Sequence, residues 1–329
     1  MRVLLVDSID PSGEALMRAS KAELLYCQEA SFDGIRRAAA EADAIITRSR
    51  LPDDVFVAAP NVRAVTIHGT GTDLVPRAPA TERGILIASL PGGNAQSVAE
   101  YCVMALLILS RNFLEIDKAI RTKPWDETRL LGAKAHEVAG MTVGLVGVGE
   151  IGKRIAHICR NGFGMNVLGN RRRMDKADPN AEPAELDALV ERSDAIIVTC
   201  PLSPETYHLF EAKRIARMKK TAWLINAGRG AVIDEGALVD ALRDRRIGGA
   251  MLDVYEHYRL EPGHPLLALD NAVLTPHLAG MTVESRGRVS ILAAEDTLRM
   301  LAGERPRHLV NPEAWDAFTM RFSGRQKTA

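Results

Sequence analysis

The chain has 329 residues, a length that suggests about two domains, and 47% of its residues are hydrophobic, which is enough to fill their cores. Lys and Arg number 42 and so do Asp and Glu, so no net charge favours nucleic acid or a membrane surface as a partner. The four cysteines have neither a zinc spacing nor a CxxC pair, and they are interpreted as buried thiols of a cytoplasmic protein. The apolar run over residues 101–109 is far shorter than a membrane span.

Short apolar segments alternate with helical patterns along most of the chain, which predicts an α/β protein with parallel sheets. A long amphipathic run over 97–112 contains neither Pro nor Gly and predicts a helix, as does the run over 283–301. The polar tail from Phe318 to Ala329 is expected to be loosely ordered. Strands are expected in two series, 3–6, 44–47, 64–67 and 85–88, then 142–146, 166–168, 195–198, 222–225, 249–252 and 272–274.

A glycine motif lies between the first strand of the second series and the helical pattern that follows it. Residues 147–152 have the sequence GVGEIG, with Gly147, Gly149 and Gly152 in the GxGxxG spacing of a dinucleotide-binding turn. Glycines let the backbone approach a pyrophosphate closely, and the positive end of the helix, at Glu150 and Ile151, faces that anion. The motif therefore predicts a dinucleotide cofactor.

The residues after the next strand indicate which dinucleotide. A carboxylate about 20 residues beyond the glycines would bind a ribose 2′-hydroxyl. This chain instead has Asn170, Arg171, Arg172 and Arg173 there. Arginine binds a 2′-phosphate with a bidentate fork, so the sequence favours NADP(H), with NAD as the alternative. A solvated basic turn is the competing interpretation.

Three polar residues follow strands of the second series, at the sheet edge where such folds bind their ligands. Arg229 follows the strand at 222–225, Asp253 follows 249–252, and His277 follows 272–274. A guanidinium can bind the carboxylate of a 2-keto acid through two hydrogen bonds. An imidazole can give a proton to the keto oxygen as hydride reaches the carbon. Each residue alone could be structural, but their joint placement favours catalysis.

At these residues the chain resembles the D-isomer-specific 2-hydroxyacid dehydrogenase family. The resemblance covers almost all of the chain. The matching segments are 69–73, 91–100, the glycine turn, 201–202, 226–230, 253–256 and 275–277.

The resemblance implies two doubly wound parallel-sheet domains with a cleft between them. A flavodoxin-like substrate domain would comprise residues 1–98 plus 283–329, and a Rossmann cofactor domain would comprise 99–282. The active site would lie in the cleft, and the stretch over 101–140 would be the arm through which a homodimer forms.

The resemblance also implies roles for individual residues. Arg229 would bind the substrate carboxylate and His277 would be the acid/base. Backbone N–H groups at Thr70 and Gly71 would complete the carboxylate site. The residues expected to contact the cofactor, besides the glycine turn and the basic segment, are Cys200, Pro201, Ala227 and Asp253.

The chain departs from the family at one catalytic position. The family usually has a Glu, followed by Pro, five residues beyond the equivalent of Asp253, and this Glu pairs with the histidine. Here Tyr258 and Arg259 occupy those two positions. Either no carboxylate pairs with His277, or Glu261 takes that role, or Glu256 does.

Arg48 and Arg50 are a further candidate pair, because they follow the expected strand at 44–47. They resemble the arginines with which phosphoglycerate dehydrogenases bind a phosphate, so they predict a second anionic group on the substrate. A solvated basic loop is the alternative.

The leading hypothesis is an NADPH-dependent 2-keto acid reductase. One alternative is an NAD-dependent D-2-hydroxyacid or phosphoglycerate dehydrogenase. Another is a nucleotide-sensing, corepressor-like binding protein, which the retention of both Arg229 and His277 disfavours.

Overall fold

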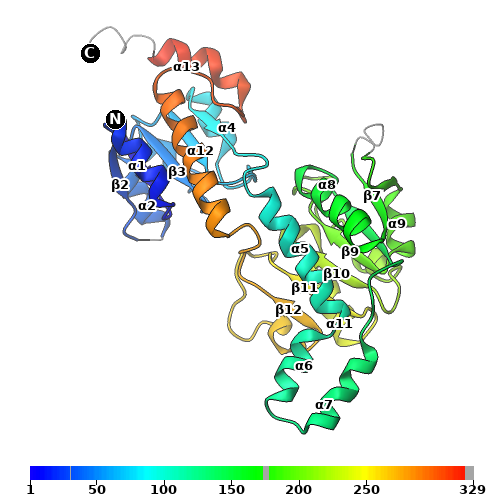
Figure 1. Ribbon diagram of the computed structural model, residues 1–329. Helices are drawn as coiled ribbons and strands as arrows, with labels where there is room; N and C mark the ends of the chain where they lie inside the picture. The colour runs from blue at the N-terminus through cyan, green and yellow to red at the C-terminus, as the bar shows by residue number, and fades with distance from the viewer. Residues whose placement is uncertain (30, 173–177, 323–329) are drawn as a thin grey trace. The chain divides into compact units, whose positions relative to one another are not determined.

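The computed structural model describes residues 1–29, 31–172 and 178–322 (Figure 1). The chain divides into two compact units, which we call unit 1 (Met1–Asn94 with Met281–Ala329) and unit 2 (Ala95–Gly280). The chain passes from one unit to the other a few residues before the boundaries expected from the sequence. The first boundary falls where helix α5 begins, at Ala95, so this whole helix belongs to unit 2.

Unit 1 is built on a five-stranded parallel sheet in the order β2-β1-β3-β4-β5, which is the flavodoxin-like order. The central strands β3 and β4 are buried at every residue, because helices cover both faces of such a sheet. The strands are β1 (Arg2–Leu5), β2 (Glu23–Tyr26), β3 (Ala44–Thr47), β4 (Ala64–Ile67) and β5 (Leu86–Ala88). The helices are α1 (Pro11–Ala19), α2 (Phe32–Ala39), α3 (Val55–Ala58), α4 (Arg77–Glu82), α12 (Val283–Leu301) and α13 (Trp315–Phe322).

Two elements of unit 1 differ from the sequence prediction. Strand β2 was not predicted, because it is an edge strand and buries only Leu24 of its four residues. The tail was expected to be loose from Phe318, and for the described residues this is wrong. Trp315, Phe318 and Phe322 recur at helical spacing in α13, and Phe318 and Phe322 are 2% and 7% exposed because they pack into the core of unit 1.

Unit 2 is built on a seven-stranded parallel sheet in the order β12-β11-β10-β9-β6-β7-β8. Counted from β6, the first six strands have the Rossmann order 3-2-1-4-5-6. The predicted fold class, α/β with two doubly wound parallel sheets, is therefore confirmed. The strands are β6 (Thr142–Val146), β7 (Asn166–Asn170), β8 (Glu182–Pro183), β9 (Ala195–Val198), β10 (Trp223–Asn226), β11 (Gly249–Leu252) and β12 (Ala272–Leu274).

Helices cover both faces of this sheet (Figure 1). One hydrophobic cluster packs α5 and α8 against the strands, and a second packs α9, α10 and α11. The helices are α5 (Ala95–Ser110), α6 (Phe113–Ile120), α7 (Trp125–Leu131), α8 (Glu150–His157), α9 (Leu186–Arg192), α10 (Ala212–Ile215) and α11 (Glu235–Arg243). Short single turns are η1 (Gly132–Lys134), η2 (Ile158–Gly162), η3 (Gly230–Val232) and η4 (Pro265–Ala268), with η5 (Pro312–Ala314) in unit 1.

Among the described residues, no helix is by itself both long and apolar enough to cross a membrane. Helices α5 and α6 meet that test only when they are taken together across a bend of 61°.

Candidate active site

The glycine turn lies between β6 and α8, as the sequence predicts. Gly147 has a φ of +103°, and a Cβ there would come within 2.6 Å of the Cys200 backbone nitrogen. A Cβ on Gly152 would come within 2.3 Å of the Gly147 oxygen. Around Gly149, by contrast, a Cβ would meet nothing within 4 Å. The turn is therefore closely packed at Gly147 and Gly152 and open at Gly149, next to the N-terminus of α8. Such a turn fits a dinucleotide pyrophosphate.

The polar segment after β7 begins beside this turn. The Gly147 N–H donates to the Asn170 carbonyl at 2.9 Å, which joins the turn to the end of β7. The Asn170 side chain donates to the Ala184 carbonyl at 3.0 Å, so this amide supports the fold. Arg171 is half-buried and Arg172 is exposed, while Arg173 lies outside the described residues. Two guanidinium groups thus follow directly after Asn170, the residue that is hydrogen-bonded to the glycine turn.

Cys200, Pro201 and Ala227 line the next two strand ends. Cys200 is 7% exposed, and burial raises the pKa of its thiol to about 11, so the thiol stays neutral near pH 7. Three of the four cysteines are buried, as predicted, whereas Cys27 is only half-buried. Pro201 is exposed and Ala227 half-buried.

The turn after β10 carries Arg229 and is held by one buried amide. Asn226 is 1% exposed, its Oδ1 accepts from the Gly228 N–H at 3.0 Å, and its Nδ2 donates to the Arg229 carbonyl at 3.0 Å. A Cβ on Gly230 would lie 1.9 Å from the Tyr255 carbonyl carbon, so only glycine fits there. Because the backbone on both sides of Arg229 is fixed, the half-buried guanidinium starts from a defined position.

A buried carboxylate organises the turn after β12. Asp253, at the end of β11, is 1% exposed. Its Oδ1 accepts from Thr275 Oγ1 at 2.7 Å and from the Leu278 N–H at 2.8 Å, and its Oδ2 accepts from the Ala279 N–H at 2.9 Å. The His277 N–H donates to the Asp253 carbonyl at 2.8 Å. Asp253 therefore fixes the backbone that presents His277.

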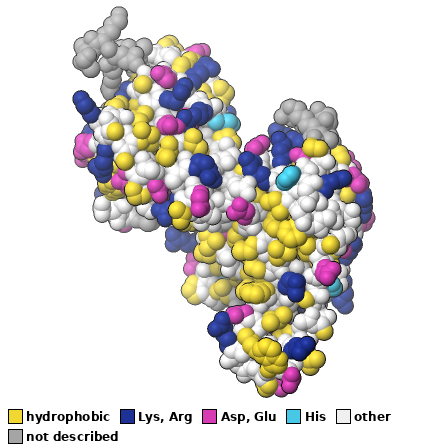
Figure 2. All heavy atoms as spheres, viewed as in Figure 1, with side chains coloured by type: hydrophobic (Ala, Val, Ile, Leu, Met, Phe, Trp, Pro, Cys, Tyr) yellow, Lys and Arg dark blue, Asp and Glu magenta, His cyan; other side chains and the backbone are white. Residues whose placement is uncertain are grey.

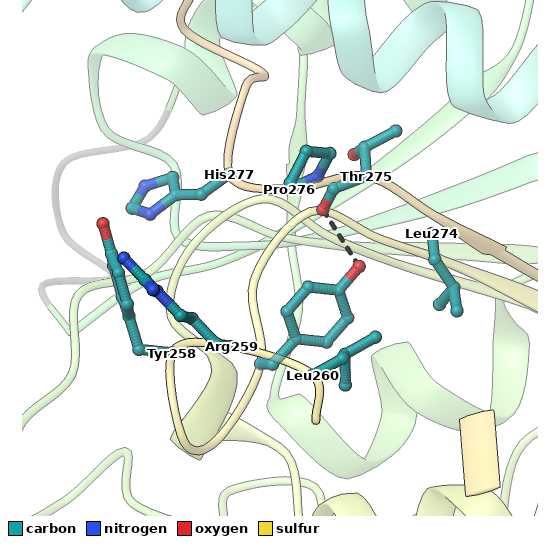
Figure 3. A pocket seen from close by; sticks show the side chains of 8 residues that line it. Tyr258, Arg259, Leu260, Leu274, Thr275, Pro276 and His277 are labelled. Carbon is teal, nitrogen blue, oxygen red and sulfur yellow. Dashed lines mark hydrogen bonds between the residues drawn. The ribbon is translucent and has the colours of Figure 1, made fainter. Parts of the chain in front are cut away.

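His277 lines a cavity of about 520 Å³. Leu274, Thr275 and Pro276 complete its wall on the β12 side (Figure 3). The opposite wall comes from the segment between β11 and η4 and consists of Tyr255, Tyr258, Arg259 and Leu260.

Tyr258 faces His277 across one end of this cavity. The two rings meet edge to face, with centroids 5.9 Å apart and an interplanar angle of 72°. Both residues have a left-handed backbone, with φ of +66° for Tyr258 and +54° for His277. Figure 3 shows that the Tyr258 and Arg259 side chains point toward the side of the cavity where His277 lies. Non-glycine residues seldom adopt this conformation outside constrained sites, so its occurrence in two facing residues marks a site held by its surroundings.

Glu256 and Glu261, the two carboxylates considered as partners of His277, are not among the residues that line its cavity. Glu256 binds His208, with 2.8 Å between Oε1 and Nε2. Glu261 is exposed and does not line the cavity. A second pair joins His264 Nε2 to Glu235 Oε1 at 3.1 Å. These two histidine–glutamate contacts anchor the loop on either side of Tyr258 and Arg259.

The candidate residues Arg48, Arg50, Thr70 and Gly71 lie in unit 1. Asp7, at the end of β1, accepts from the Arg48 and Ser49 N–H groups at 2.7 and 2.9 Å and thereby holds that loop. Arg50 is exposed, with Asp53 Oδ1 at 3.5 Å. The Thr70 hydroxyl donates to the Leu90 carbonyl at 3.4 Å.

A second histidine at a strand end, His68, was not singled out from the sequence. It follows β4 and is 8% exposed, and its Nε2 lies 2.8 Å from Ser290 Oγ. Burial lowers the pKa of His68 to about 4, and the nearby Arg48 charge acts in the same direction. His68 is therefore a neutral residue of the core near pH 7.

Sequence reasoning assigned no role to Asn226 or Asp7, and it predicted that Asp253 contacts the cofactor rather than supports a loop. The signal was present, because each is a short polar residue directly after an apolar strand. Asn and Asp at such positions accept backbone N–H groups of the next turn. Asn226 holds its own turn, whereas Asp7 and Asp253 hold turns that follow neighbouring strands, and the sequence does not state which strands are neighbours.

Comparison with known proteins places these features in one family. A family model described as "D-isomer specific 2-hydroxyacid dehydrogenase, NAD binding domain" matches residues 103–279. A glyoxylate reductase of Thermofilum pendens is 42% identical over 272 residues, which make up 80% of this chain and 79% of that protein.

Two solved structures are similar in fold. The first is an NAD-dependent formate dehydrogenase of Staphylococcus aureus in complex with NAD, at 26% identity and a TM-score of 0.84, covering 94% of this chain and 99% of that one. The second is an NADPH-dependent glyoxylate/hydroxypyruvate reductase of Sinorhizobium meliloti in complex with citrate, at 27% identity and a TM-score of 0.81, covering 95% and 98%.

A Rossmann sheet with this glycine turn, and with an arginine and a histidine at its strand ends, defines a nicotinamide-dependent dehydrogenase. The chain belongs to the D-isomer-specific 2-hydroxyacid dehydrogenase family. It is accordingly an NAD(P)-dependent oxidoreductase that acts on a CH–OH group.

Proposed function

We propose that this protein is a reductase of small 2-keto acids that works with NADPH. The observation that carries the proposal is the cavity wall at His277, which lies at the carboxyl edge of the sheet that also bears the glycine turn. The cofactor, when bound, supplies the hydride that reduces the keto carbon.

The residues of this chain would carry out the remaining steps. Arg229 binds the substrate carboxylate through paired hydrogen bonds and polarises the keto group. His277 donates its proton to the keto oxygen while hydride reaches the carbon, so that a 2-hydroxy acid and a neutral imidazole result. Asn226 and Asp253 hold the two turns in place. Thr70 and Gly71 of unit 1 would add backbone donors for the carboxylate.

The preference for NADPH rests on the segment after β7. Arg171 and Arg172 lie where a ribose-binding carboxylate would otherwise stand, and their charge suits a 2′-phosphate. The Sinorhizobium meliloti reductase supports this choice, because it is NADPH-dependent. The formate dehydrogenase with NAD supports the alternative, NAD.

For the acid/base, we propose that Tyr258 occupies the place beside His277 that the usual glutamate has in the family. The supporting observations are that the Tyr258 ring faces the imidazole, that Glu256 is bound to His208, and that Glu261 does not line the cavity. Arg48 and Arg50 remain candidates for a second anionic group of the substrate.

We further propose a cytoplasmic homodimer that forms through α6 and α7. Figure 2 shows hydrophobic side chains on the surface over these two helices. The exposed side chains there include Phe113, Leu114, Trp125 and Leu130, of which Trp125 and Leu130 are 69% and 73% exposed. Apolar side chains gathered in this way mark a protein interface more often than a free surface.

A panel of 2-keto acids, assayed with NADPH and with NADH, tests the function. Turnover of glyoxylate or hydroxypyruvate with a higher kcat/KM for NADPH is the expected result. A protein that binds both nucleotides but reduces no 2-keto acid would instead be a nucleotide-sensing binding protein. Higher efficiency with NADH would refute the proposed cofactor preference alone.

A further inference from the structure

Arg259 is a cation whose position the proposed mechanism leaves unexplained. It lines the same cavity as His277, and it is exposed. No carboxylate of the described residues forms an ion pair with its guanidinium, as is also true of the exposed Arg111, Arg129 and Arg160 of unit 2, but of these four arginines Arg259 is the one that lines the cavity. A guanidinium without such a partner, beside a catalytic cavity, is available to an anionic ligand.

The loop that carries Arg259 is held on both sides. Glu256 binds His208 before it, and His264 binds Glu235 after it. The Arg259 N–H donates to the His257 carbonyl at 2.7 Å, which closes a tight turn around Tyr258. The guanidinium is therefore presented from a preformed loop, and ordering it for a ligand costs less than it would on a mobile segment.

The cavity is also larger than the smallest substrate of this class requires. Its volume of about 520 Å³ falls within the range of pockets that hold much larger molecules. Glyoxylate has no side chain to fill it. Leu260 and Leu274 add apolar surface to the lining, which suits the methylene groups of a longer substrate (Figure 3).

We propose that Arg259 binds a second anionic group, so that the preferred substrates are 2-keto acids with a distal carboxylate or phosphate. The keto group lies at His277, the methylene groups of the substrate contact the apolar lining, and the distal anion reaches Arg259. This inference rests on the proposed function of the same site. Arg259 is a specificity-determining residue here, because it contacts a part of the substrate that does not react.

Matched substrates test the inference. The wild-type kcat/KM is measured for 2-oxoglutarate against 2-oxohexanoate, and for 3-phosphohydroxypyruvate against hydroxypyruvate. We expect the dianion of at least one pair to be favoured about tenfold, as for one charge-assisted contact at an exposed site. The pair with the larger ratio identifies the anion as carboxylate or phosphate. If the wild type shows no preference in either pair, or prefers the member without the second anionic group in both, the inference is overturned.

Variants locate the effect. Arg259→Gln should lower the dianion preference about tenfold and leave glyoxylate reduction unchanged, whereas Arg259→Lys should retain part of the preference. Arg243→Gln removes an exposed guanidinium of α11 outside the cavity and should change neither ratio. If Arg259→Gln preserves the preference, or if Arg48→Gln with Arg50→Gln abolishes it instead, the second anion is bound elsewhere and the inference is wrong.

Calorimetry separates this inference from the proposed function. Binding of 2-oxoglutarate to the protein saturated with NADP⁺ requires no turnover, and Arg259→Gln should weaken it about tenfold. Such weakening in a protein that reduces no 2-keto acid would uphold the anion site and refute the proposed function. Glyoxylate turnover with no Arg259-dependent binding would do the reverse.

Discussion

The carboxyl edges of the two sheets each present a histidine, and the two residues differ in environment. His68 follows β4 in unit 1, is 8% exposed, and lies 2.8 Å from Ser290 Oγ. His277 follows β12 in unit 2, lines a cavity, and has a left-handed backbone held by Asp253. Position at a strand end therefore does not make a histidine catalytic. Access to a cavity and a constrained turn are what distinguish His277.

The largest expected effect contrasts the two histidines directly. His277→Ala should lower kcat for keto acid reduction by about 10²- to 10⁴-fold, because the proton donor is lost. Arg229→Ala should raise KM steeply and also lower kcat, since this residue both binds and polarises. His68→Gln should leave kcat close to the wild-type value. Steady-state kinetics with glyoxylate check all three, and a fast His277→Ala enzyme would place the active site elsewhere.

The burial of His68 should make the free energy of unfolding depend on pH in the acid range. Burial lowers the pKa of His68 from 6.5 to about 4, so the unfolded state binds the proton more readily between these values. His68 thus stabilises the fold fully above pH 6.5, and this contribution is lost as the pH falls toward 4. At about 1.4 kcal/mol per pKa unit, the loss approaches roughly 3 kcal/mol.

The measurement is urea unfolding from pH 7 to pH 4, in wild type and His68→Gln. The variant should show a flatter decline with falling pH, whatever its stability at pH 7. Parallel curves for the two proteins would show that His68 titrates normally.

The next prediction compares Asp253 and Asp7, the carboxylates that hold turns at the carboxyl edges of the two sheets. Asp253 is 1% exposed and accepts two backbone N–H groups and one hydroxyl. Asp253→Asn turns an amide NH₂ toward one of these donors and should destabilise the protein by about 1–3 kcal/mol. Asp7 is only half-buried, so water can replace its bonds and Asp7→Asn should cost less. The shift of the urea midpoint measures both, and equal shifts would contradict the contrast.

A smaller effect concerns the cofactor. Arg171→Ala and Arg172→Ala should each weaken NADPH binding roughly tenfold, the lower end expected for charge-assisted bonds, and hardly change NADH binding. Arg192→Ala is a matched control, because this arginine is exposed and pairs with Glu182 outside the turn. Fluorescence titration gives the Kd values. Tighter binding of NADH than of NADPH by the wild type would refute the assignment.

The smallest effect is a shift of the pH profile. Tyr258→Glu places a carboxylate opposite His277, which favours the protonated imidazole, so the falling limb of keto acid reduction should move up by about one pH unit. The substitution adds no backbone cost of its own, since Tyr258 already has a left-handed φ. If Glu261 is the true partner, Glu261→Gln should lower the limb and Tyr258→Glu should do little. If neither substitution moves the falling limb of the pH profile, this loop does not affect the protonation of His277.

Many elements of the fold could be predicted from the sequence because the patterns that indicate them are local. Strands β3, β4, β6, β9, β11 and β12 and helix α12 have the residues predicted for them. Apolar strands buried on both faces stand out from their surroundings, and a GxGxxG turn between a strand and a helix needs no distant contact to be recognised. The edge strands β2 and β8 and helix α13 were missed. Few of the β2 and β8 residues are buried, and the buried face of α13 is a short aromatic stripe in a polar tail.

The sequence by itself determined the α/β class, the dinucleotide turn, and the set of polar residues that follow the strands. Only the tertiary structure decided which of these residues face a cavity and which are buried. Strand order is the physical reason, because it brings Asp253, which follows β11, beside the turn after β12. The same long-range packing buries His68 against α12, and it sets Tyr258 opposite His277 where the family has a carboxylate.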